Sequence, residues 1–157
     1  MHMQVSSVNP SLTPTELAAW RGLLRAHAAL IRDLDAELHA RHHLSLHEYE
    51  VLLTLADAPG GRMRMSELAT AVVLSQSGLT RLVDRLVRDG SVARVRCEGD
   101  RRGLNAELTD AGRRRYREAR ATHLAGVRSR FLGHFSEAEL NILGESWERI
   151  SPGATAE

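Results

Sequence analysis

The amino-acid sequence predicts a mainly α-helical fold with one small β-hairpin. Apolar residues recur at helical spacing over most of the 157 residues. Three Ser/Thr-x-x-Glu capping boxes, which begin at Thr13, Ser45 and Ser136, mark helix starts. The stretch 92–108 instead alternates apolar and polar residues, which is typical of strands. A chain of this length suits one domain with a core of its own.

The first helix is expected within 13–44, after an N-terminal arm, 1–12, that lacks periodicity and should be flexible. Pro14 follows the cap residue Thr13 and occupies a favoured first helical position. Apolar residues then recur about every 3.5 positions and form a broad face, which usually packs against more than one partner. The periodic residues are Leu17, Trp20, Leu24, Ala28, Ile31, Leu34 and Leu38.

The region 45–112 is predicted to begin with a helix opened by the capping box at Ser45 and ended by Pro59-Gly60-Gly61. Residues 62–65 are expected to add a short strand. Ser66 is then expected to cap a short helix over 65–73.

A longer helix is predicted over 75–89, with Ser75 as its N-cap and Gly90 just past its end. Its buried face is expected to carry Leu79, Leu82, Val83, Leu86 and Val87. Asp84 precedes Arg88 by four residues, so these two side chains are expected to pair along the helix.

The hairpin 92–108 has two adjacent arginines, Arg101 and Arg102, at its tip. Cys97 shares a strand side with Val95 and is therefore expected to be a buried, inert thiol. A short helix, a tight turn, a longer helix and an Arg-tipped hairpin together predict a winged helix-turn-helix, with 75–89 as recognition helix and 92–108 as wing. Thr109 should cap the next helix, from Asp110 to about Leu132, and the capping box at Ser136 should open a last helix. The range 113–150 thus contains the C-terminal helices, and 151–157 is expected to be a tail.

The outer face of the 75–89 helix suits the major groove of DNA. Ser, Thr and Gln side chains can bond base edges, and Arg can bind guanine or phosphates. The segment 75–102 also carries seven arginines against four acidic residues, although the whole chain has a net charge of only +1. A solvated helix face is the alternative, and for Ser75 capping alone is a sufficient explanation. The predicted DNA contacts are Ser75, Gln76, Ser77, Thr80, Arg81, Arg85, Arg88, Arg101 and Arg102.

The run 100–112 resembles the wing signature D-x-R-x5-L-T-x-x-G of MarR-type regulators, and the resemblance extends over 13–150. It implies that the helices in 13–44 and 113–150 interlock two subunits into a homodimer. It also implies a repressor that a small effector, such as an aromatic acid, releases from DNA. Two recognition helices about 34 Å apart address successive major grooves, so a pseudo-palindromic operator is expected.

In the family that the chain resembles, effectors bind between the dimer helices and the winged domain. Residues that are expected to line such a site here are Trp20, Arg21, His27, His42 and His47. Trp20 also occupies a core-like position of its helix, where packing is the alternative role.

Other functions stay open as alternatives. The histidines His39, His42, His43 and His47 raise a metal-sensing interpretation, but zinc needs about four converging ligands and no thiol is near them in sequence. Cys97 raises the interpretation that the protein senses oxidants through this thiol. A winged-helix protein-interaction module, or a non-specific DNA-binding one, is the remaining alternative.

Several classes of protein are disfavoured by the sequence. It has no P-loop, GxGxxG, GxSxG or HExxH motif, so no enzyme activity, cofactor or metal is expected. One cysteine excludes an intramolecular disulfide. Because no apolar run is long enough for a membrane span or a signal peptide, a cytoplasmic location is expected.

Overall fold

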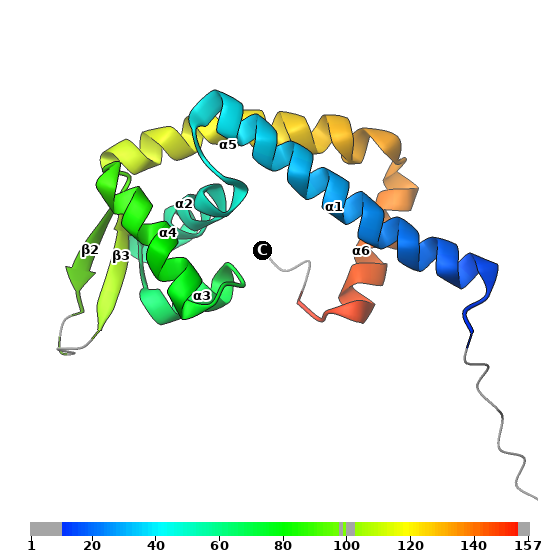
Figure 1. Ribbon diagram of the computed structural model, residues 1–157, viewed down its shortest axis with the longest axis horizontal. Coiled ribbons are helices and arrows are strands. Elements are labelled where there is room, and N and C mark those ends of the chain that lie inside the picture. Colours follow the sequence, from blue (N-terminus) through cyan, green and yellow to red (C-terminus); the bar gives the residue numbers. More distant parts are fainter. Residues whose placement is uncertain (1–10, 98, 100–102, 154–157) are drawn as a thin grey trace, which may run out of the picture.

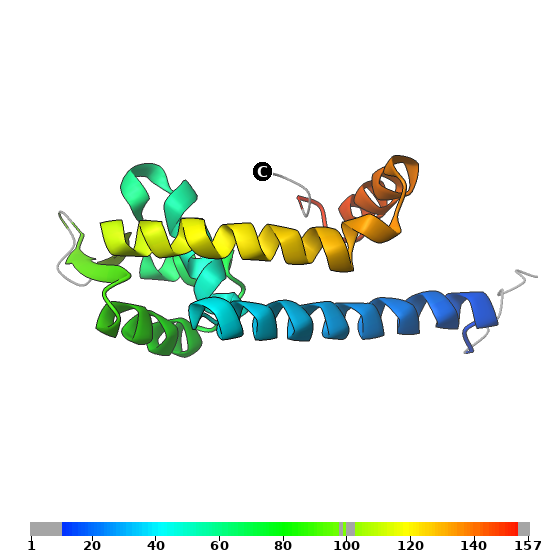
Figure 2. The same cartoon turned by 90° about the horizontal axis from the view of Figure 1, so that it is seen from above.

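A computed structural model describes residues 11–97, 99 and 103–153. Two long helices, α1 (Pro14–His42) and α5 (Asp110–Arg130), run side by side along its length (Figures 1 and 2). The helix-turn-helix and the strands lie at one end of this pair. The last helix, α6 (Glu137–Ile150), lies at the other end, so the molecule has the shape of an arch (Figure 1).

All three predicted capping boxes are present. The hydroxyl oxygens of Thr13, Ser45 and Ser136 each accept a hydrogen bond from the backbone N–H three residues on, and that residue's carboxylate accepts one in return. The bond from the Thr13 N–H lowers the pKa of Glu16, and the bond from the Ser136 N–H does the same for Glu139.

The winged helix-turn-helix follows α1 and confirms the predicted fold class. In the three-stranded antiparallel sheet, β3 lies between β1 and β2, and Met63 and Arg94 both pair with Ala106. The elements in chain order are α2 (Leu46–Asp57), the 3₁₀ turn η1 (Pro59–Gly61), β1 (Arg62–Arg64), α3 (Met65–Ala71), α4 (Gln76–Arg88), β2 (Val92–Arg96) and β3 (Leu104–Leu108).

The expected cap of α3 was wrong. The helix begins at Met65, Arg64 occupies the N-cap position, and no side chain caps it. Ser66 lies inside the first turn, where its carbonyl accepts a hydrogen bond from the Thr70 hydroxyl at 3.2 Å. The strand β1 leads directly into α3, which leaves no room for a capping turn.

The core lies between α2, α3, α4, the sheet and the middle of α5. Four of the five apolar residues predicted for the inner face of α4 are buried, whereas Val87 is 36% exposed at the edge of that face. The fully buried members include Val51, Leu52, Leu55, Leu68, Leu79, Val83, Leu86 and Ala106. Burying a Leu side chain stabilises a fold by about 1.5–3 kcal/mol, so this cluster provides most of the stability of the winged lobe.

The start of α5 lies directly against the turn that follows α4. The Thr109 hydroxyl oxygen accepts a hydrogen bond from the Gly112 N–H at 3.0 Å, and the same hydroxyl lies 2.6 Å from the Gly90 carbonyl oxygen. A Cβ at Gly112 would overlap the Ser91 carbonyl oxygen and lie 2.8 Å from Leu108 Cδ1. The signature glycine is therefore required by close packing.

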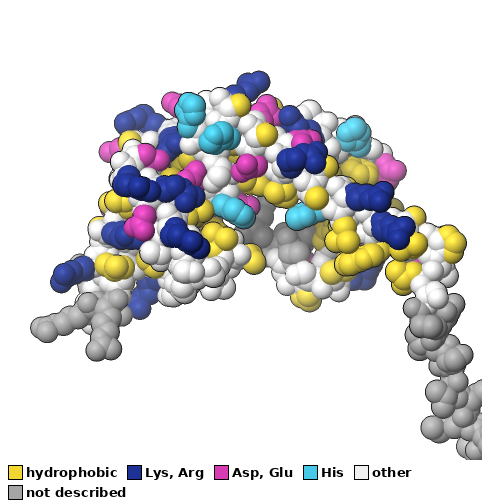
Figure 3. Space-filling view, viewed as in Figure 1, with side chains coloured by type: hydrophobic (Ala, Val, Ile, Leu, Met, Phe, Trp, Pro, Cys, Tyr) yellow, Lys and Arg dark blue, Asp and Glu magenta, His cyan; other side chains and the backbone are white. Residues whose placement is uncertain are grey.

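Apolar side chains remain exposed at the end of the arch that lacks the winged lobe. Hydrophobic side chains gather over the first half of α1 and over α6 (Figure 3). No described residue of α6 is buried. The larger exposed side chains here are Leu12, Trp20, Leu23, Leu24, Ile31, Leu132, Ile142 and Ile150. Within the described ranges, none of the helices has the length and apolar character that crossing a bilayer requires.

We predict that Gly112→Ala destabilises the protein by about 3 kcal/mol, because the added methyl group has no space beside the Ser91 carbonyl. The free energy of unfolding in urea measures this change. Gly22→Ala is the control, since nothing lies within 4 Å of a Cβ at that helical position. It should be neutral or stabilising, and equal losses in both variants would contradict the packing argument.

The turn between α3 and α4 contains a strained residue. Val73 has a φ of 52°, in the left-handed region that a β-branched side chain rarely adopts, and it is 89% exposed. We predict that Val73→Gly raises the stability by about 1 kcal/mol, because it relieves the strain and removes no buried contact. Val73→Ala should gain less. A lower melting temperature for the glycine variant would refute the prediction.

Candidate nucleic-acid interface

The N-terminus of α4 presents short polar side chains. Ser75 caps the helix as predicted, and its hydroxyl oxygen accepts a hydrogen bond from the Gly78 N–H at 3.1 Å. The Thr80 hydroxyl donates to the Gln76 carbonyl at 2.8 Å. Gln76, Ser77 and Thr80 are all exposed, so this end of the helix is open to a ligand that offers donors and acceptors.

A groove of about 500 Å³ lies beside these residues, between the start of α3, the outer face of α4 and the wing. The two arginines that line it, Arg64 and Arg94, were not among the DNA contacts predicted from the sequence. Both alternate with apolar residues in short strands, a pattern that does not reveal which way the strand faces. The groove is lined by Arg64, Met65, Ser66, Gln76, Thr80, Arg94, Gly103 and Leu104.

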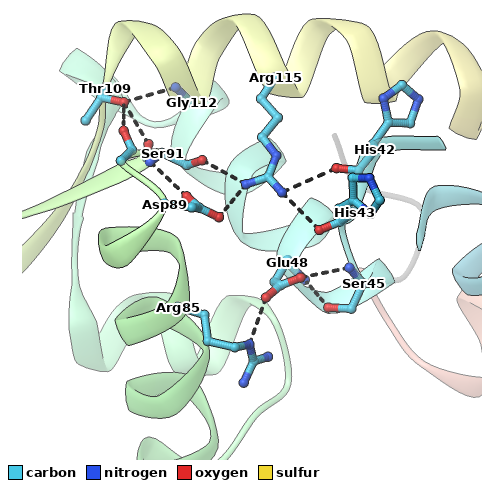
Figure 4. Close-up of polar contacts among 11 residues, drawn as sticks. His42, His43, Ser45, Glu48, Arg85, Asp89, Ser91, Thr109, Gly112 and Arg115 are labelled. Atoms are coloured by element: carbon cyan, nitrogen blue, oxygen red, sulfur yellow. Dashed lines mark hydrogen bonds and ion pairs between the residues drawn. The ribbon is translucent and has the colours of Figure 1, made fainter. Parts of the chain in front are cut away.

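The arginines of α4 divide into two groups. Arg81 and Arg88 are exposed, and within the described part of the chain neither makes a recorded ion pair. Arg85 instead donates its Nε–H to Glu48 at 2.9 Å, which ties the recognition helix to α2 (Figure 4). Its side chain is half exposed.

Asp84 does not pair with Arg88, and that expectation was wrong. The Asp84 carboxylate accepts a hydrogen bond from Arg94 Nη1 at 2.6 Å, and Arg94 Nη2 lies 3.4 Å from the Thr80 carbonyl oxygen. From β2, the Arg94 guanidinium group meets two acceptors of α4, the Asp84 carboxylate and the Thr80 carbonyl.

Part of the wing can be compared with the prediction. Arg101 and Arg102, predicted at its tip, lie outside the described residues. Cys97 is partly buried, not fully buried as expected, and its thiol lies 3.1 Å from Asn105 Oδ1.

One arginine of α5, Arg115, joins the ends of two other helices. Its Nη1 donates to the Asp89 carboxylate and to Ser91 Oγ, the latter at 3.1 Å. Its Nη2 donates to the carbonyl oxygens of His42 at 3.3 Å and His43 at 2.9 Å (Figure 4). The sequence analysis did not identify this cluster, because its members come from three segments that are far apart in the sequence.

The five residues predicted to line an effector site do not converge within one chain. Trp20, Arg21 and His27 are exposed near the start of α1. His42, at its other end, lies 2.7 Å from Thr122 Oγ1, and His47 lies 3.0 Å from Glu50. Trp20 and His42 are 22 residues apart in one helix, or about 33 Å.

An aromatic cluster lies between α2 and α5, close to the His42 end. The ring centroid of Tyr49 lies 4.5 Å from that of His123 and 5.8 Å from that of Tyr116. Burial, together with the neighbouring Tyr116, raises the pKa of Tyr49 to about 12. Burial lowers the pKa of His123, whose buried Nδ1 has no hydrogen-bond partner among the residues that the structure describes. Burial therefore favours the neutral form of His123.

The histidines considered for a metal are only partly grouped. The rings of His39 and His43 are edge-on with centroids 6.3 Å apart. Across the ranges that the structure covers, no three side chains of the metal-binding types form a group that could hold an ion.

Known proteins that are similar to this chain belong to the MarR family and share its winged helix-turn-helix architecture. The MarR family profile matches residues 42–103. The HTH-type transcriptional repressor YetL of Bacillus subtilis is 31% identical over 112 residues, which cover 69% of this chain and 66% of YetL.

Two solved structures from Streptomyces coelicolor are similar over almost their whole length. The MarR family transcriptional regulator AbsC has a TM-score of 0.87 and 35% identity, and the match covers 95% of this chain and all of AbsC. Sco3205, crystallised in complex with DNA, has a TM-score of 0.87 and 32% identity, with 91% and 93% coverage. The geometry of the winged lobe and these matches together show that this chain belongs to the MarR family of transcriptional regulators.

Proposed function

We propose that this protein is a homodimeric repressor that binds a pseudo-palindromic DNA operator and is released by a small effector. The observation that carries the DNA-binding role is the outer face of α4. It presents Gln76, Ser77, Thr80, Arg81 and Arg88 to solvent, beside a groove that the wing completes. The complex of the similar Sco3205 with DNA supports this role.

The individual contacts follow from position. Gln76 and Thr80, near the helix N-terminus, are placed to meet base edges, and Arg81 is placed to read a guanine. Arg88, exposed at the end of the helix, is assigned to a phosphate. The wing-tip arginines Arg101 and Arg102 are assigned to the minor groove on the sequence pattern alone.

The dimer is supported by the exposed apolar residues of α1 and α6. In a monomer, four large apolar residues would be at least half exposed, namely Trp20, Leu24, Ile142 and Ile150. A contiguous apolar surface of this kind marks an interface with another protein surface. A second copy of the same helices would cover it and set the spacing of the two recognition helices.

The effector proposal rests on the aromatic cluster and the nearby histidines. Among the described residues the buried Nδ1 of His123 has no hydrogen-bond partner, and its ring lies against Tyr49, so a molecule that separates α2 from α5 here would find a free acceptor and an aromatic wall. An effector that binds here acts only if its affinity differs between arrangements of the winged lobes that fit DNA and those that do not.

A binding experiment tests the DNA-binding role. Duplexes selected by the purified protein from a random-sequence pool are compared with unselected duplex across a salt series. Selective binding that weakens steeply with salt is expected, because several arginines displace counterions from phosphates. Equal binding to both duplexes would favour a non-specific DNA clamp or a protein-interaction module.

We predict that Arg81→Ala relaxes the sequence preference at one base position, with a loss of about 1–3 kcal/mol on the preferred duplex. Binding to single-base variants of the selected duplex measures the change. Arg25→Ala, which removes an exposed arginine of α1, should leave both affinity and preference unchanged. If Arg81→Ala weakens binding to all duplexes equally, Arg81 contacts the backbone and not a base.

Replacing Leu24, which is 50% exposed, by Glu should weaken the dimer at least about tenfold, because a buried carboxylate without a partner is costly. Sedimentation at several protein concentrations gives the dimer dissociation constant. Ala18→Glu introduces the same charge away from the apolar stripe of α1 and should have little effect. An unchanged dissociation constant for Leu24→Glu would place the interface elsewhere.

A further inference from the structure

Arg115 connects the recognition helix to the two long helices through one guanidinium group. It lies on α5, one turn after Gly112, and its side chain is 24% exposed. One terminal nitrogen bonds the Asp89 carboxylate and Ser91 Oγ, at the end of α4. The other bonds two backbone carbonyls at the end of α1 (Figure 4).

The electrostatics of these two helix ends favours a cation between them. The C-terminus of a helix carries partial negative charge and carbonyl groups without intrahelical partners. His42 is the last residue of α1, and His43 is its C-cap in a left-handed conformation. Asp89 is the C-cap of α4, where a carboxylate without a cation is unfavourable. Arg115 therefore compensates the negative ends of α1 and α4 together with the Asp89 charge.

The carboxylate of Asp89 is itself held in place. Its Oδ1 accepts a hydrogen bond from the Ser91 N–H at 3.0 Å, while Oδ2 faces Arg115. The guanidinium group is planar and its donors point in fixed directions, so it sets the distance between the groups that it joins. A lysine in this position could not bond both helix ends with the same geometry.

We propose that Arg115 is a positioning residue that fixes the direction of the recognition helix relative to the long helices. In a dimer the long helices fix the separation of the two winged lobes, so Arg115 sets which spacing of half-sites the protein accepts. This inference rests on the proposed function, because it requires a dimer that binds two half-sites.

Operators of altered spacing test the proposal. The selected duplex is compared with duplexes in which one base pair is added or removed between the half-sites, a change of about 3.4 Å and about 34°. The wild type should lose affinity on both altered duplexes. Arg115→Met should bind the original duplex more weakly, and its penalty for altered spacing should be smaller by about fivefold. Arg115→Lys should behave like Arg115→Met, and Asp89→Asn should show the same tolerance to a smaller degree.

Arg114→Met is the matched control. It removes one positive charge from the neighbouring, exposed position of α5, so it reproduces any loss of general attraction to DNA. Its spacing penalty should equal that of the wild type. If Arg115→Met and Arg115→Lys lower the affinity by one common factor on all spacings, Arg115 only stabilises the fold or attracts DNA, and the proposal is overturned.

A measurement without DNA separates this proposal from the proposed function. Spin labels are attached at Arg25→Cys on α1 and Arg88→Cys on α4, in a Cys97→Ser background that removes the one native thiol. Labelled protein is diluted with unlabelled protein, so that each distance is measured within one chain. Arg115→Met should broaden the distribution of distances, and Arg114→Met should not.

Failure of the proposed function and failure of the positioning role then give different results. A wild-type protein that binds selected and random duplexes equally refutes the proposed function, whatever the label distances show. An unchanged distance distribution in Arg115→Met refutes the positioning role, even when the wild-type protein selects its operator.

Discussion

The close approach of α5 to the turn after α4 is the constraint on which the rest of the winged lobe depends. Gly112 lies against the Ser91 carbonyl, and Thr109 bonds both the start of α5 and the end of that turn. Thr109 also separates β3 from α5, so the end of the wing and the beginning of a long helix are fixed by one residue. The recognition helix, the wing and the long helices therefore meet at this junction.

Ion pairs of arginine extend that junction along the C-terminal part of α4. Arg85 binds Glu48 of α2, Asp84 binds Arg94 of β2, and Asp89 binds Arg115 of α5. Each pair joins the recognition helix to a different neighbour. Exposed pairs contribute little stability individually, but they restrict how the helix can tilt. Because the chain has 21 arginines and no lysine, composition alone cannot distinguish these structural arginines from those that face DNA.

Features that depend on residues close in sequence could be predicted. The caps at Thr13, Ser45, Ser75 and Thr109 involve a side chain and a backbone group three residues away, so the spacing alone identified them. The fold class followed from the order of such elements. Contacts between segments could not be predicted in the same way. The partner of Asp84 lies ten residues away, in β2, and the acceptors of Arg115 lie up to 73 residues away, where no periodicity relates them.

Glu48 shows how a local motif acquires a second role in the folded chain. Its carboxylate accepts a hydrogen bond from the Ser45 N–H at 2.8 Å and also binds Arg85 (Figure 4). The first turn of α2 and the last turn of the recognition helix are thus joined by one side chain. Exchange of DNA-reading segments between related proteins must respect this arrangement. A transplanted α4 needs its Glu48 counterpart and also Arg115, whose acceptors include the His42 carbonyl. The core of the lobe extends to Ala119 of α5, so the smallest transferable unit reaches at least from His42 to Ala119.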